Sequence, residues 1–278
     1  MIRKEMNVGG IKVVSEKFDS IHDFLNNYEN KPASEAYASH DTANNLQDEV
    51  YDSSERQFRG VSGYPEAVNQ LKNGVNVKAI KSARTHAESG MKRVVKHSVN
   101  GGRVCVPAYL SGSPACMRRS VRVPAKTELN VVVDTAVPCG ITSKQVTEAG
   151  KIIVKYITEL EERYNVNIHA ITSTSFNQSY RRGYTDAYVF GIKIKDAGKP
   201  FSAARVSFCL TSAAFQRVFS FLWRTRAEGV PYDWALGYST SNNMEIETKV
   251  VNAVYKNSIL ISINHIIDKG EAALPKVK

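Results

Sequence analysis

Basic and aromatic side chains alternate at several places in the chain, and this combination is the chemistry of single-stranded nucleic-acid binding. The densest example is Tyr180-Arg181-Arg182-Gly183-Tyr184, which follows a predicted strand and precedes another. Basic groups contact phosphates, whereas aromatic rings stack on bases, each stack contributing about 1–3 kcal/mol. Arginine can also stack on a base plane while it contacts phosphate. A solvated loop tip with one tyrosine folded onto the core is the alternative. Trp223-Arg224-Thr225-Arg226 is a weaker candidate, because Trp223 also has the spacing of a core residue.

A second group of cations is concentrated in one segment. The chain has a net charge of +10, and residues 71–126 contain twelve Lys or Arg against one acid, Glu88. Residues 1–70 contain seven Lys or Arg against twelve Asp or Glu. A concentrated basic block is typical of a polyanion partner, and nucleic acid is our interpretation. A purely solvated face, an acidic protein and a membrane surface remain the alternatives.

We predict that cations of this segment line a groove and displace counterions, while the tyrosines and arginines of the loop stack on and grip bases. The predicted contact residues are Lys92, Arg93, Lys96, Arg103, Arg118, Arg119, Arg122, Tyr180, Arg181, Arg182 and Tyr184.

The residue types that could support enzyme chemistry lack the necessary partners. Asp134 ends a predicted strand, where ligands of open α/β sheets bind. A metal site of the von Willebrand A type needs hydroxyl residues at the positions of Ala136 and Pro138, so we reject it. We expect Asp134 to cap a turn. Cys139 and His169 form no known nucleophile–base motif, and His169 lies in an apolar run. The sequence therefore predicts no enzyme and no cofactor.

The elements that position these groups centre on residues 129–172. LNVVVD is a β-branched apolar run, Thr142 and Gln145 have capping-box spacing, and VNIHAIT is a second apolar strand pattern. The intervening segment has apolar residues at three- and four-residue steps, as in a helix packed on a sheet. We predict a right-handed βαβ unit in a parallel sheet. The predicted fold class is α/β, a layered sheet with helices on both faces and a von Willebrand A-like or Rossmann-like core.

Four regions are expected along the chain. Residues 1–58 are predicted to form an acidic, loosely ordered arm, and 59–126 a basic α/β subregion with a helix within 76–97. Residues 127–267 form the predicted α/β core, and 268–278 a flexible tail. Within the core, residues 186–195 and 203–210 are predicted as a β-hairpin, residues 212–228 and 243–257 as helices, and residues 258–267 as a strand.

The sequence predicts a cytoplasmic protein, in the host cell if it is encoded by a phage. No apolar run approaches the roughly 20 residues that span a bilayer, and MIRKEMNVGG lacks the apolar region of a signal peptide. The four cysteines have no metal-binding spacing and fit a reducing compartment. No membrane association is expected.

Two motifs support a resemblance. The pattern F-x-G-x-x-x-x-x-E-A in Phe58–Ala67 and VPAYLSGSPACM in Val106–Met117 resemble a family of uncharacterised bacteriophage proteins. In size, basicity and α/β core, the chain is also similar to the single-stranded DNA-binding RNA polymerase cofactor of phages that package an RNA polymerase in the virion. These resemblances imply binding of single-stranded DNA in transcription or replication, with a phage RNA polymerase as a partner. Self-association is also expected, since such proteins coat strands cooperatively. The alternative is a non-enzymatic phage structural or interaction protein whose basic face binds an acidic partner.

Overall fold

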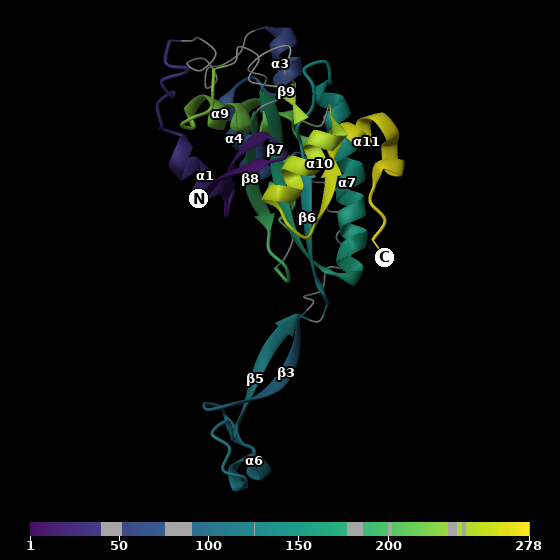
Figure 1. The fold of residues 1–278 in the computed structure, drawn as a ribbon. Helices are drawn as coiled ribbons and strands as arrows, with labels where there is room; N and C mark the ends of the chain where they lie inside the picture. The colour runs from purple at the N-terminus through teal and green to yellow at the C-terminus, as the bar shows by residue number, and fades with distance from the viewer. Residues whose placement is uncertain are drawn as a thin grey trace.

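The computed structural model describes residues 1–39, 52–75, 91–124, 126–176, 186–199, 202–232, 238–240 and 243–277 (Figure 1). They form a mixed α/β core and a separate three-stranded sheet that extends away from it. The core strands are β1 (Ile2–Val8), β2 (Ile11–Phe18), β6 (Glu128–Asp134), β7 (Asn165–Phe176), β8 (Asp186–Lys195), β9 (Tyr238–Ser239) and β10 (Ser258–Ser262). The core helices are α1 (Ile21–Tyr28), α3 (Ser53–Arg59), α4 (Tyr64–Asn73), α7 (Ser143–Arg163), α8 (Ala203–Thr211), α9 (Phe221–Arg226), α10 (Met244–Val254) and α11 (Ile263–Lys269).

The main sheet has the strand order β1-β2-β8-β7-β6-β10, with β9 paired to the end of β7. β7 is parallel to β6, as β10 is, whereas β8 is antiparallel to β7. The predicted βαβ unit is therefore confirmed. Its helix begins at the predicted capping box, in which Gln145 N donates to Thr142 Oγ1 at 3.3 Å and Thr142 N donates to Gln145 Oε1 at 2.9 Å.

Helices cover both faces of the sheet, which confirms the predicted fold class. α7, α8, α9 and α11 pack on one face against strand residues such as Val131 and Phe190. α10 packs on the other face, where Val250 and Val254 meet Val132 and Val189. Alternate residues of β6 therefore belong to different cores, which is why a continuous apolar run was a correct strand signal.

The first 28 residues belong to the core, so the prediction of a loosely ordered arm is wrong for them. β2 pairs with β8 in the sheet, and Glu16 on β2 is 1% exposed. The Glu16 carboxylate accepts hydrogen bonds from Tyr28 Oη at 2.5 Å and Trp223 Nε1 at 2.9 Å, and it pairs with Arg3 at 3.0 Å. These partners lie on β1, α1 and α9, and sequence patterns do not report a contact such as the one with Trp223, 207 residues away.

Four further segments differ from expectation. Residues 203–211 form α8 and not a strand, because short apolar runs fit either structure until packing decides. Residues 258–267 divide into β10 and the start of α11. The expected free tail is also wrong, since residues 270–273 form a 3-10 helix and Leu274 and Val277 pack on the main core. The helix predicted from residue 212 is observed as a π-helical turn, Phe215–Ser220, followed by α9.

Candidate nucleic-acid interface

A hairpin arm made of residues 91–124 contains all seven of the cations predicted from the basic segment. Its strands are β3 (Met91–Ser98), β4 (Arg103–Val104) and β5 (Met117–Pro124), and its tip includes the short helix α6 (Val106–Leu110). Figure 1 shows the arm extending away from the α/β core, with α6 at its far end. The helix predicted within residues 76–97 is wrong for 91–97, which belong to β3 and pair with β5. Residues 76–90 lie outside the described residues.

The base of the arm is attached to the N-terminal end of β6. Asn165 Nδ2 donates to the Lys126 carbonyl at 2.9 Å, and Lys126 Nζ donates to the Glu161 carbonyl at 2.6 Å. These bonds connect Lys126, two residues after the arm, to the C-terminal part of α7 and the start of β7. They fix the place at which the arm leaves the core.

The strand register brings cations from distant positions next to one another. Arg93 is the Cα partner of Arg122, and Lys96 that of Arg119. Arg118 lies between His97 on β3 and Arg103 on β4. Like charges directly opposite one another are unfavourable in a sheet. Residues 91–124 contain no acid to offset this repulsion, so an anionic partner would relieve it.

The described cationic side chains lie on both faces of this small sheet. Because side chains alternate along a strand, His97, Arg118 and Arg103 share one face, and Lys96 and Arg119 share the other. All five are exposed. The first face is hollowed between Val95, His97, Gly102, Arg103, Arg118 and Ser120. The side chains of Lys92, Arg93 and Arg122 lie outside the described residues, although their backbone positions are within the strands.

The described residues that flank the aromatic segment and those that flank the arm lie at opposite ends of the sheet. Tyr180, Arg181, Arg182 and Tyr184 lie outside the described residues. The last described residue before them, Phe176, ends β7, whereas the arm joins β6 at its N-terminal end. β7 is twelve residues long, about 40 Å in extended geometry. The flanking residues therefore give no support to a single groove, made within one chain, that combines both predicted surfaces.

The Trp223–Arg226 segment is part of the core and is not an exposed binding surface. Trp223 is fully buried and stacks on Phe190, with ring centroids 5.6 Å apart. Arg226 Nη1 donates to the carbonyls of Tyr28 and Glu29, each at 2.7 Å. The helical spacing of Trp223 from Phe219 was the correct signal for burial.

Asp134 forms the turn that we predicted, and it has a neighbour that the sequence did not reveal. Its Oδ1 accepts from the amides of Ala136 at 2.9 Å and Ser173 at 3.2 Å. Burial raises the pKa of Asp134, against the opposing effects of these bonds and of Arg224. Burial and the nearby Asp134 charge likewise raise the pKa of Glu247 on α10, whose Oε2 lies 3.4 Å from His265 Nε2. Both carboxyls are 0% exposed, so no substrate reaches them without repacking.

We expect the Glu247→Gln variant to be more stable than the parent protein at pH 8 and to lose this advantage at pH 5. A carboxyl whose pKa is raised in the folded state keeps its proton where the unfolded chain releases it, so stability falls as pH rises above about 4 toward neutrality. Glutamine removes that ionisation. An increase of about 1 kcal/mol in the free energy of unfolding would raise the melting temperature by about 2–4 °C.

Glu245→Gln is the matched control, because Glu245 lies in the same helix but is exposed and paired with Lys249. Its melting temperature should follow that of the parent from pH 5 to pH 8. A destabilised Glu247→Gln protein at pH 8 would contradict the prediction.

Cys139 and His169 have separate surroundings. Cys139 is exposed in the loop after β6, whereas His169 pairs in register with Val132 within the sheet. Burial lowers the pKa of His169 to about 4, and its ring lies 5.1 Å from that of Tyr255. His169 is thus a partly buried residue within the sheet, in the apolar run that the sequence showed. Within the described residues there is also no group of three or more His, Cys, Asp or Glu side chains that could hold a metal ion.

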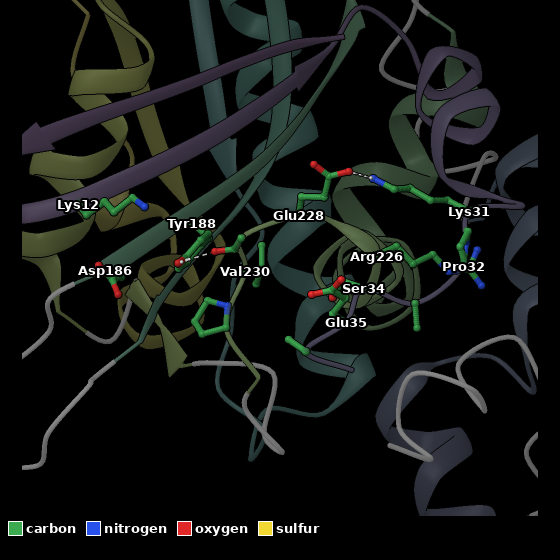
Figure 2. Close-up of a pocket in the computed structure, with 14 residues that line it drawn as sticks. Lys12, Lys31, Pro32, Ser34, Glu35, Asp186, Tyr188, Arg226, Glu228 and Val230 are labelled. Carbon is green, nitrogen blue, oxygen red and sulfur yellow. Dashed lines mark hydrogen bonds and ion pairs between the residues drawn. The ribbon is translucent and has the colours of Figure 1, made fainter. Parts of the chain in front are cut away.

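A second hollow lies at the core, where β2 and β8 begin (Figure 2). It has a volume of about 820 Å³ and contains charges of both signs. Lys31 points toward Glu228, with 3.9 Å between Nζ and Oε1, and Tyr188 Oη donates to the Gly229 carbonyl at 3.2 Å. The pairing of opposite charges gives this hollow no marked preference for an anion, unlike the arm.

The fold and the arm together define an α/β protein with a projecting cationic hairpin. Within the described residues, no helix combines the length and apolar character needed to cross a membrane. The chain belongs to the family described as "Domain of unknown function (DUF7192)", which it matches over residues 3–273. Comparison with curated proteins found no match, and neither did comparison with solved structures.

Proposed function

We propose that this protein binds nucleic acid through the cationic hairpin arm. The observation that supports the proposal most directly is the charge of residues 91–124, which contain seven Lys or Arg and no acid on an extended sheet. A protein that neutralises phosphates releases condensed counterions, and this release favours binding. An arm with cations on both faces can contact phosphates on either side of it.

The dimensions of the arm fit a nucleic-acid strand or groove. Over residues 91–96 and 119–124 the arm is a two-stranded ribbon of β3 and β5. A two-stranded β-ribbon is narrow enough to enter a major groove, and a single strand can run along either face. Lys92 and Lys96 on β3 are four residues apart, as are Arg118 and Arg122 on β5, so cations on one side of a strand recur about 13 Å apart. The arm therefore offers cations in repeated positions to a ligand with repeated phosphates.

The preference for single-stranded DNA is the finer part of the proposal. It rests on Tyr180, Arg181, Arg182 and Tyr184 and on the phage resemblance. By that resemblance, the protein acts in phage transcription as an RNA polymerase cofactor, or in replication, and it self-associates on the strand. An acidic protein partner for a phage structural or interaction protein is the alternative, favoured by the apolar side chains exposed on the same arm, such as Leu110.

Titration of labelled single-stranded and duplex oligonucleotides at several salt concentrations tests the proposal. If about six phosphates are contacted, the log–log slope of affinity against salt should be about −4 for single strands and about −5 for duplex. Fluorescence anisotropy gives both the affinities and the slopes. Absence of binding at low salt would contradict the function, and equal weak binding to heparin would indicate a non-specific polyanion surface.

A further inference from the structure

The tip of the arm exposes apolar side chains next to the strands that carry its cations. Six of the ten exposed large hydrophobic residues among the described side chains are on the arm. They include Val106, Tyr109 and Leu110 on α6, which are 60%, 65% and 78% exposed. An exposed apolar cluster beside a charged rim is typical of a binding surface.

The conformation of the tip is fixed by its own backbone and not by an apolar core. Cys105 N donates to the Cys116 carbonyl at 2.6 Å, and Tyr109 N donates to the Cys105 carbonyl at 2.9 Å. Cys105 is the one residue of the tip that is buried, and Arg118 Nη2 lies 3.5 Å from its Sγ. These contacts leave apolar side chains of α6 exposed to solvent, while Arg118 contacts Cys105, the residue that precedes α6.

The charge pattern indicates which partner covers this apolar tip. A lipid surface is planar, so it would meet one face of the arm, yet cations lie on both faces of the sheet. In nucleic acid, phosphates and flat apolar base surfaces repeat together along one molecule. A base with an exposed face can stack on an aromatic ring, and apolar side chains can wedge between bases whose stacking is disturbed.

We propose that Tyr109 and Leu110 contact unstacked bases of the same nucleic acid whose phosphates the arm neutralises. This proposal rests on the proposed function and specifies its ligand class: nucleic acid with accessible base faces, such as a single strand or a duplex interrupted by unpaired bases. The tyrosine ring supplies the stacking surface, and the leucine side chain supplies the wedge. A closed duplex offers neither face and is bound through phosphates alone.

The test compares the parent protein with the Tyr109→Ala/Leu110→Ser double variant. The probes are a labelled single strand, a closed duplex, and a duplex with two unpaired bases. We expect the variant to lose about 10-fold or more in affinity for the single strand and the interrupted duplex, and less than about 2-fold for the closed duplex. Its salt slope should equal that of the parent, because no cation is removed.

Ile2→Ser/Met244→Ser is the matched control, since both side chains are about half exposed but lie on β1 and α10, away from the arm. It should bind all three probes as the parent does. A fluorescent base analogue placed at the unpaired position should change its emission with the parent and not with the tip variant.

The outcomes separate this inference from the function on which it rests. If the parent binds no probe at low salt, the proposed function fails. If the parent binds but the tip variant binds equally well, the function stands and the base contact is wrong. Tip-dependent binding to vesicles that contain anionic lipid, without a change in nucleic-acid affinity, would instead overturn the inference in favour of a membrane surface.

Discussion

Reversal of charge at Arg118 and Arg119 is expected to reduce nucleic-acid affinity by about 100-fold at moderate salt. These neighbours lie on opposite faces of β5, and each is exposed beside another cation of the arm. The Arg118→Glu/Arg119→Glu variant removes two phosphate contacts and adds two repulsive charges. The salt slope for a single strand should become shallower by about 1.4, since each lost contact contributes about 0.7.

Lys151→Glu/Lys155→Glu makes the same charge change on α7, at the core. Each of these lysines forms a surface ion pair, with Glu148 and Glu271 respectively, so its reversal should cost little stability. Fluorescence anisotropy should give near-parent affinity for this control. If both double variants lose affinity equally, net charge and not the arm determines binding, and the assignment of the interface is wrong.

Gly150→Ala is expected to destabilise the protein by about 3 kcal/mol or more, although alanine is the better helix former by about 1 kcal/mol. Gly150 lies in α7 where α8 packs against it. A Cβ at this position would lie 2.0 Å from the Leu210 carbonyl oxygen and 2.8 Å from its carbon. A backbone atom cannot rotate away as a side chain can, so the two helices must separate.

Gly140→Ala is the control for this substitution, because nothing lies within 4 Å of a Cβ at Gly140. Urea unfolding should show a change within about 0.5 kcal/mol for Gly140→Ala, as is usual for surface sites. A Gly150→Ala protein as stable as the parent would mean that α7 and α8 do not pack this closely in solution.

Local sequence patterns predicted an element correctly where its type depends on its own residues. The strand run ending at Asp134, the capping box of Thr142 and Gln145, and the apolar stripe of α7 each report a nearby physical requirement, and each was confirmed. Residues 91–98 and 203–211 were assigned incorrectly, because their type depends on the segments against which they pair or pack.

The candidate site shows the same division between local and distant information. Its composition was evident, since cations without acids over residues 91–124 are a property of the chain itself. Their arrangement was not, because the register that brings Lys96 opposite Arg119, and Arg118 between His97 and Arg103, joins residues up to 23 positions apart. The exposed tip was missed for a related reason: VPAYL has the apolar character of a core segment, and only its distance from the core leaves it in solvent.

The sequence by itself determined the α/β class, the βαβ unit and the basic segment, because apolar periodicity and charge depend on neighbouring residues. Only the tertiary structure decided that this segment is a projecting hairpin and that Glu16 joins the N-terminal strands to the core. It also decided that Asp134 and Glu247 are buried near each other. These features depend on contacts between distant parts of the chain, and such contacts form and stabilise the protein only in the folded state.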